Sequence, residues 1–263
     1  SQDRILEKEF ALSLNIPTVE FFNISNYEEL NQVKKDHDYI LKTRRLGYDG
    51  KGQYDLNHIQ SHQIELNHNS GYILEKKCLF DAEISIAITR FKDGCTFFES
   101  SQNTHRSGIL RYSISPSLQS KEVIEKAQMY TQKMVESLDY IGVFVVEYFV
   151  KDNELFFNEF APRPHNSFHQ TIESCEFSQF DTHIRAITLQ RRVEPKLMSA
   201  SLMVNVLGDN YDKIQGFIES TTIPIHFHWY GKTELRLKRK MGHMTILCDD
   251  PSAVIEQWEE HLC

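Results

Sequence analysis

The sequence predicts an α/β (α+β) protein made of two α/β lobes followed by a small β-rich domain. Helix and strand patterns alternate over the first lobe, 1–78. Long β-branched runs and one long helix pattern occupy the second lobe, 79–192. Mainly short strand patterns fill the last segment, 193–263. Alternation of apolar residues at a period of 2 or 3.6 is the basis of these assignments.

In the first lobe, residues 3–14 have apolar side chains at helical spacing, and Asn15-Ile16-Pro17 ends this helix. A strand is expected at 18–22. A second helix should run from a Ser25 cap to about residue 35, with Glu28 completing a capping box. Strands at 39–42, 53–56 and 72–76 complete the lobe.

The second lobe should begin with a hairpin of 82–91 and 95–99, because Asp93-Gly94 is a strong turn signal. We then expect a loop at 103–117, a helix at 120–139, a hairpin at 143–160 and a helix at about 168–188. The last segment should hold strands at 201–206, 225–230 and 243–248 and a helix at 251–262.

Composition limits the function classes. The chain has 263 residues, 40% hydrophobic and 25% charged, and a net charge of −8. An acidic protein lacks the basic face that nucleic-acid polymers require. Neither a run of 18 apolar residues nor a signal peptide is present. The five cysteines form no metal-binding pattern and are expected to be reduced thiols, which favours a cytoplasmic protein with no membrane partner.

Glu147 and Glu159 are the most informative pair. They lie near the ends of two strand-like runs joined by Lys151-Asp152-Asn153, which reads as a hairpin. A tight turn would place the two carboxylates nearly opposite each other on one face. Two such carboxylates repel unless a cation separates them, and Mg²⁺ prefers oxygen ligands. The pair indicates a Mg-nucleotide site. The alternative is two solvent-facing glutamates on an edge hairpin.

Directly after Glu159, two prolines hold a rigid turn that carries Arg163, His165 and Asn166. Loops of this kind carry binding groups more often than core positions do. Arg163 offers a planar fork for a phosphate or carboxylate. Each residue alone has an ordinary structural explanation, such as a helix cap, but the three together beside a metal site point to a ligand.

A glycine-rich loop at 44–52 forms another candidate site. Its glycines free the backbone to approach a ligand, and Lys51 adds charge suited to phosphate. It lacks the spacing of a Walker A loop. The alternative is a simple hairpin turn. Lys42, at the end of the preceding strand, could reach phosphates or remain solvated.

Weaker signals lie elsewhere. Glu75 and Glu83 could hold a ribose hydroxyl and an adenine amino group, although a surface role for both is the alternative. The loop carrying His105 and Arg111 suits an anion. Cationic groups on both sides of the turn after Tyr230 suit a phosphate.

Five motifs together resemble one family. They are RRLGYDGKGQ (44–53), NTHRSGILRYSISP (103–116), NEFAPRPHNS (158–167), SQFDTHIRAI (178–187) and YGKTELRLKRKMGH (230–243). In this order they resemble 5-(carboxyamino)imidazole ribonucleotide synthases of the ATP-grasp superfamily. The resemblance implies an ATP-grasp fold and a ligase that converts ATP, bicarbonate and 5-aminoimidazole ribonucleotide to the carboxyamino product, ADP and phosphate, through carboxyphosphate. It also implies a cytoplasmic homodimer in purine biosynthesis.

The resemblance assigns a role to each candidate residue. Glu147 and Glu159 would bind Mg²⁺ or Mn²⁺. The ATP contacts would be Lys42, Lys51, Glu75, Lys76 and Glu83. Tyr48, Asp49, Arg163 and His165 would lie at the carboxylation site, and His105, Arg111, Asn166, Lys232 and Arg239 would bind the aminoimidazole ribonucleotide.

Some features depart from the family pattern. Ala161 occupies a position that is Asn in many ATP-grasp enzymes, and Phe168 and Gln170 stand where Gly and Trp are common. The family's N-terminal domain has no counterpart here, so we expect this chain alone to have weak or no activity. Two alternatives are another ATP-grasp ligase and a non-catalytic ATP-binding module.

Overall fold

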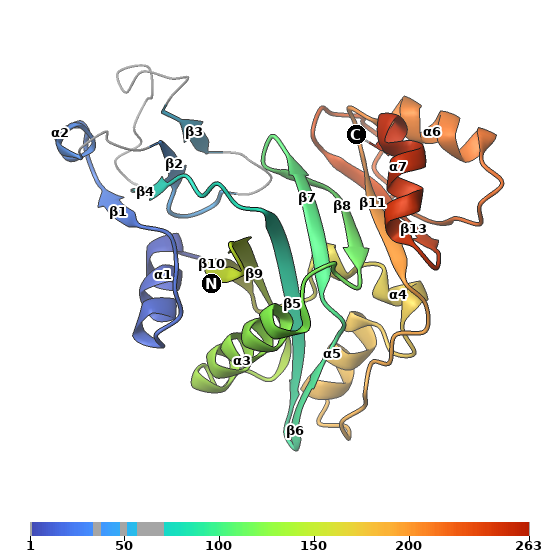
Figure 1. The fold of residues 1–263 in the computed structure, drawn as a ribbon, viewed down its shortest axis with the longest axis horizontal. Helices are drawn as coiled ribbons and strands as arrows, with labels where there is room; N and C mark the ends of the chain where they lie inside the picture. The colour runs from blue at the N-terminus through green and yellow to red at the C-terminus, as the bar shows by residue number, and fades with distance from the viewer. Residues whose placement is uncertain (1, 34–37, 48–51, 57–70, 263) are drawn as a thin grey trace.

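The computed structural model describes residues 2–33, 38–47, 52–56 and 71–262. Two antiparallel sheets with flanking helices make up the molecule (Figure 1). The helices are α1 (Arg4–Ser13), α2 (Tyr27–Gln32), α3 (Lys121–Ser137), the 3₁₀ helix η2 (Asn166–Phe168), α4 (Thr171–Ser174), α5 (Gln179–Ile187), α6 (Tyr211–Ser220) and α7 (Pro251–Leu262). The strands are β1 (Phe21–Ile24), β2 (Tyr39–Thr43), β3 (Gln53–Asp55), β4 (Tyr72–Lys76), β5 (Ala82–Phe91), β6 (Gly94–Phe97), β7 (Ser101–Arg106), β8 (Ile109–Ser115), β9 (Gly142–Lys151), β10 (Glu154–Ala161), β11 (Ser201–Leu207), β12 (His226–Trp229) and β13 (Lys240–Leu247).

The smaller sheet has four strands in the order β1-β4-β2-β3 and packs with α2, whereas α1 packs on β10 of the larger sheet. The core of the smaller sheet is apolar: Ile24, Leu30, Tyr39, Leu41, Tyr72 and Leu74. The predicted Ser25 cap with Glu28 was wrong by one residue. Asn26 caps α2 by accepting from the Glu29 backbone N–H, while the Glu29 carboxylate accepts from the Ser25 backbone N–H at 2.7 Å. The expected strand at 18–22 begins later, at Phe21.

The larger sheet has nine strands, in the order β10-β9-β5-β7-β8-β11-β13-β12, with β6 paired to β5. Helix α3 packs its apolar side on one face, and α5 packs on β5 and β9. The sheet continues from the second lobe into the last segment, because β11 pairs with β8. Our division into 1–78, 79–192 and 193–263 remains a prediction. The boundary between residues 192 and 193 separates strands of one continuous sheet.

Three expectations differ from the structure. The expected loop at 103–117 is largely the hairpin β7–β8, which contacts η2 and buries the polar residues Ser101, Asn103, Arg111, Ser113 and Ser115. The expected helix at 168–188 is broken between α4 and α5, because Ser178 begins α5 with a capping box to Asp181. Helix α6 was not predicted, although Ile214 and Phe217 bury its apolar side.

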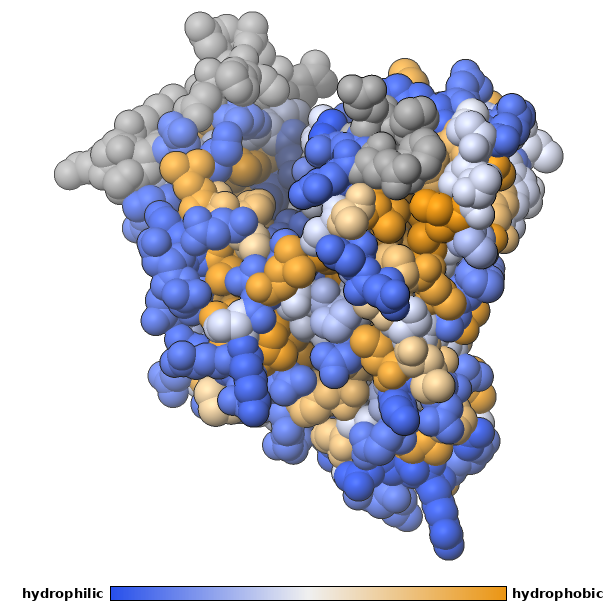
Figure 2. Space-filling view, turned by 45° about the vertical axis from the view of Figure 1, so that its right-hand side comes forward, coloured by the Kyte–Doolittle hydropathy of each residue, from blue (hydrophilic) through white to orange (hydrophobic). Residues whose placement is uncertain are grey.

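Hydrophilic and hydrophobic residues are intermixed over the face seen in Figure 2. Among the described residues, none of the helices has the length and apolar content needed to span a membrane. The four described cysteines, Cys78, Cys95, Cys175 and Cys248, are free thiols, as expected.

Candidate functional site

The β9–β10 hairpin places Glu147 and Glu159 directly opposite each other. Asp152 and Asn153 both have positive φ, 51° and 62°, which is the type I′ turn that matches strand twist. Counted from this turn, Asn158 would oppose Glu147. An irregularity between Phe157 and Glu159 moves Glu159 into that place. The predicted pairing of the two carboxylates is therefore present.

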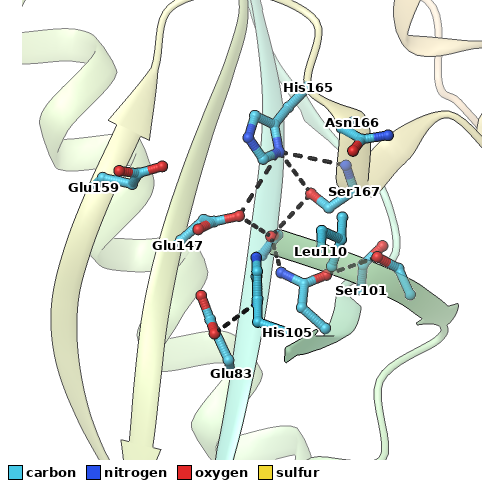
Figure 3. Close-up of polar contacts among 12 residues, drawn as sticks. Glu83, Ser101, His105, Leu110, Glu147, Glu159, His165, Asn166 and Ser167 are labelled. Carbon is cyan, nitrogen blue, oxygen red and sulfur yellow. Dashed lines mark hydrogen bonds and ion pairs between the residues drawn. The ribbon is translucent and has the colours of Figure 1, made fainter. Parts of the chain in front are cut away.

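Glu147 lies at the centre of a buried acidic cluster. Glu83, His105 and Glu147 point toward one another from β5, β7 and β9 (Figure 3), and a ligand atom of each lies within 4.8 Å of those of the others. Burial, and then the carboxylates of Glu83 and Glu159, raise the pKa of Glu147 well above its usual value. A divalent cation bound beside Glu147 would offset both the burial and the repulsion and would favour the ionised carboxylate.

His105 partly offsets this negative charge. Its Nδ1 lies 2.9 Å from Glu83 Oε2. Burial alone would lower the pKa of His105, but the Glu83 carboxylate outweighs it and raises that pKa to about 9. We predicted that His105 lies in an anion-binding loop. It lies instead on strand β7, beside Glu83, the predicted ribose contact.

Glu159 has a different partner. Arg4 Nη1 donates to Glu159 Oε2 at 2.8 Å, and a pocket of about 310 Å³ beside them is also lined by Arg44 and Arg163. Burial opposes ionisation of Glu159, but the Arg4 guanidinium outweighs it and lowers the pKa of that carboxyl. Sequence reasoning missed Arg4, and its place in the first helix pattern gave no signal of this role.

Lys42 and Glu75 form a second buried cluster, in the first lobe. Lys42 Nζ donates to Glu75 Oε2 at 2.7 Å. Lys8 Nζ, fully buried in α1, lies 3.7 Å from Glu75 Oε1 and donates to Thr18 Oγ1 at 2.9 Å. Lys8 was also missed. Lys76 lies next along β4 and lines a pocket of about 540 Å³ at the crossing between the lobes.

His165 and Asn166 connect the acidic cluster to the last segment. His165 Nδ1 lies 3.8 Å from Glu147 Oε1, and burial lowers the pKa of His165 to about 4. Asn166 exchanges two side-chain hydrogen bonds, of 2.8 and 2.9 Å, with Asn205 of β11. Arg163 is exposed and donates to the Pro164 carbonyl.

The remaining cationic candidates lie farther along the sheet. Arg111 on β8 forms an ion pair of 2.8 Å with Asp209, just after β11. Lys232 donates to the Lys240 carbonyl, and Arg239 lies at the other end of the same β12–β13 connection. Within the described residues, none of these three cations is hydrogen-bonded or ion-paired to Glu147. Tyr48, Asp49 and Lys51 lie outside the described residues.

Comparison with known proteins identifies the family. The family model of the ATP-grasp domain matches residues 9–180, and the phosphoribosylaminoimidazole carboxylase C-terminal domain matches 201–257. The N5-carboxyaminoimidazole ribonucleotide synthase of Staphylococcus aureus (strain MRSA252) is 38% identical over 257 residues, which cover 95% of this chain and 68% of that protein. The chain belongs to the N5-carboxyaminoimidazole ribonucleotide synthase family.

Solved structures of the family agree over the whole chain. The Staphylococcus aureus enzyme complexed with ADP has a TM-score of 0.91 at 36% identity and covers 100% of this chain and 71% of its own. The Aspergillus clavatus enzyme, in complex with ADP and 5-aminoimidazole ribonucleotide, has a TM-score of 0.84 at 25% identity and covers 99% and 72%. These comparisons confirm the predicted ATP-grasp fold.

The departures from the family pattern at Phe168 and Gln170 are accommodated by packing. Phe168 is fully buried against Phe98, with ring centroids 6.1 Å apart. Gln170 is buried as well and donates to Ser101 Oγ at 2.9 Å. Within the described residues, neither side chain is hydrogen-bonded to Glu147 or Glu159. Phe168, at the end of η2, and Gln170, just before α4, thus both point into the protein interior.

Proposed function

We propose that this protein catalyses the ATP-dependent carboxylation of 5-aminoimidazole ribonucleotide to N5-carboxyaminoimidazole ribonucleotide, with release of ADP and phosphate, in purine biosynthesis. Membership of the family and the relatives' complexes with ADP and with the aminoimidazole ribonucleotide support this function. The observation in this chain that carries it is the Glu147–Glu159 pair, followed directly by the turn that holds His165 and Asn166.

The donor set fits a hard divalent cation. Glu147 and Glu159 supply carboxylate oxygens from paired strands, and burial, together with the Glu83 and Glu159 carboxylates, raises the pKa of Glu147, so a cation there would favour its ionised form. We propose that these two residues hold Mg²⁺ or Mn²⁺. When bound, the cation would neutralise charge on the transferred phosphoryl group. For Glu159 to bind the cation, the Arg4 guanidinium must share Glu159 Oε2 with it or move away. Arg4 could then contact the phosphates of the nucleotide.

The two lobes would hold ATP between them. Lys42 would contact phosphates and Glu83 the ribose, with Glu75 and Lys76 as further ATP contacts; of these, Lys76 lines the pocket at the crossing between the lobes. Lys51 would cover the phosphates. The hydrogen bond between Lys42 and Glu75 already holds both side chains in place. The nucleotide would therefore bind to a preorganised site.

The turn after β10 would hold the aminoimidazole ribonucleotide. His165 is uncharged at neutral pH because burial lowers its pKa to about 4. His165 Nδ1 lies 2.9 Å from Ser167 Oγ, which fixes the ring, and we propose that the other ring nitrogen, Nε2, meets the substrate. Arg163 and Asn166 would flank it, with Tyr48 and Asp49 near the reacting amine. Lys232 and Arg239 would take the 5′-phosphate, with His105 and Arg111 as further contacts.

Bicarbonate is the expected carbon source. It is a poor electrophile, so phosphorylation to carboxyphosphate would activate it for attack by the amine. This intermediate hydrolyses readily, so the site must exclude water until the amine attacks. A homodimer and a cytoplasmic location, which fits a metabolic ligase of this family, complete the proposal.

The decisive test is ADP release in Mg-ATP and bicarbonate, with and without 5-aminoimidazole ribonucleotide. It should be run on the product of the gene that encodes this chain. We expect strong stimulation by the ribonucleotide. Mg-ATP binding without stimulation would reject the proposal in favour of another ATP-grasp ligase or a non-catalytic nucleotide-binding module.

Replacing Lys232 by alanine should separate the two substrates. Loss of a charged hydrogen bond to phosphate corresponds to about a 10- to 100-fold higher KM for the aminoimidazole ribonucleotide. The KM for ATP should not change. Steady-state kinetics with each substrate varied in turn checks this result. Lys196→Ala, which removes an exposed lysine outside the β12–β13 connection, is the control. Equal losses for both substrates would refute the assignment of Lys232.

A further inference from the structure

A chain of buried polar side chains runs from Glu147 into the sheet (Figure 3). Ser85 on β5 is in register with Glu147 on β9, and its hydroxyl lies 3.5 Å from Glu147 Oε1. Asn103 Nδ2 on β7 donates to Ser85 Oγ at 2.7 Å. Ser113 Oγ on β8 donates to Asn103 Oδ1 at 2.9 Å. Four adjacent strands are thus linked through side chains that are at most 6% exposed.

This chain of hydrogen bonds has a direction. Ser113 donates to the carbonyl end of the Asn103 amide, so the amino end faces Ser85. Ser85 Oγ accepts from Asn103 and also from Ser167 Oγ, at 3.0 Å. Its own single proton is then left for the Glu147 carboxylate. The amide of Asn103 therefore controls the direction in which the Ser85 hydroxyl points.

Packing alone does not account for these residues. The same region of the sheet contains the apolar cluster of Ala87, Val143 and Val145, so apolar side chains fit nearby. A buried hydroxyl or amide costs free energy unless every hydrogen bond is made, and an apolar replacement is often neutral. A serine and an asparagine joined to a site carboxylate are more easily explained by their effect on that carboxylate.

We propose that Ser85 and Asn103 are positioning residues that fix the Glu147 carboxylate. They hold Oε1 toward β5 and leave the other oxygen for the divalent cation of the bound nucleotide. This inference rests on the proposed function in one respect only, that Glu147 serves a metal-bound nucleotide. Neither residue is expected to touch the substrates.

Ser85→Ala tests the proposal with the removal of one hydroxyl. Loss of a group that orients a metal ligand typically weakens metal affinity at least about 10-fold. We expect the Mg²⁺ concentration for half-maximal ADP release to rise by about that factor, with little change in the KM for the aminoimidazole ribonucleotide. The rise in Tm produced by Mg-ADP should shrink in parallel, which gives a measurement independent of turnover.

Ser117→Ala is the matched control, because its hydroxyl contacts Ser100 Oγ at 2.7 Å, away from Glu147. Ser113 is the last residue in the series of hydrogen bonds that starts at Glu147. Ser113→Ala should therefore raise the Mg²⁺ requirement less than Ser85→Ala does, and it replaces Ser85→Ala if that variant does not fold. An unchanged Mg²⁺ requirement in both Ser85→Ala and Ser113→Ala would overturn the proposal, as would an equal shift in Ser117→Ala.

The result also distinguishes this inference from the proposed function. If the aminoimidazole ribonucleotide does not increase ADP release by the wild-type protein, the proposed function is refuted. If Ser85→Ala still weakened Mg-ADP binding in that protein, the positioning role would be upheld. A wild-type protein that binds no Mg-nucleotide would refute both.

Discussion

Replacing Glu159 by glutamine is expected to lower kcat for ADP release by about 100- to 1000-fold, the usual cost of losing one preorganised charge at a transition state. The substitution keeps the shape of the side chain but removes the charge that faces Glu147 across the hairpin. A bound cation would then have one anionic ligand instead of two. Rates at saturating Mg-ATP and Mg-ADP binding by calorimetry measure the effect.

Two comparisons make this result specific. Glu154→Gln removes an exposed carboxylate from the same strand, whose partner is Lys126, and should leave the rate unchanged. The Tm of Glu159→Gln should remain near wild type, because the Glu159 side chain is 37% exposed and the glutamine carbonyl can still accept from Arg4. Unchanged rate and Mg-ADP affinity in Glu159→Gln would show that this carboxylate is not a metal ligand.

The parts of the fold with local signals could be predicted. The turn at Asp152-Asn153, the long alternation of Ala82–Phe91 and the amphipathic helix α3 each depend on a few neighbouring residues. The β7–β8 hairpin could not be predicted in this way, because β7 begins with Ser101-Gln102-Asn103-Thr104 and reads as a loop. Two of these polar side chains have hydrogen-bond partners that are distant in sequence: Gln170 donates to Ser101 Oγ, and Asn103 donates to Ser85 Oγ and accepts from Ser113 Oγ.

The same limit applies to the site. The Glu147–Glu159 pair could be predicted because one hairpin carries both residues. Arg4 and Glu159 are 155 residues apart, and Ser85 and Glu147 are 62 apart, so only the folded chain brings them together. The resemblance to a family predicted the substrates. Neither the resemblance nor the residue pattern indicated that Lys8 pairs with Glu75, or that Ser85 and Asn103 are linked to Glu147.

Glu75→Gln is expected to give the largest loss of stability. Glu75 is 4% exposed and neutralises both Lys42 and the fully buried Lys8. Removing one partner of a buried ion pair typically costs about 3–5 kcal/mol, because the remaining charge is left uncompensated. We expect the free energy of unfolding, measured in urea at pH 7, to fall by about that amount. Part of it should return in the double variant Lys8→Met, Glu75→Gln, which removes one of the two uncompensated lysines.

Asp55→Asn, which weakens the partly exposed ion pair with Lys77 in the same sheet, is the control. Solvent screening should keep its cost within about 1 kcal/mol. A loss no greater in Glu75→Gln than in Asp55→Asn would show that the buried cluster does not stabilise the lobe.

The pH dependence of the Glu75 effect follows from its pKa. Burial would raise this pKa, but Lys42 and Lys8 outweigh it and lower it from 4.5 to about 2. Because the folded state holds the carboxyl ionised, its stabilising contribution is complete above about pH 4.5 and is lost as the pH falls toward 2. The difference in unfolding free energy between wild type and Glu75→Gln should therefore be constant from pH 7 to 5 and shrink by pH 3. An equal difference at pH 7 and pH 3 would mean that the Glu75 carboxylate is not stabilised by its charge interaction with Lys42 and Lys8. Glu75→Gln would then act through packing.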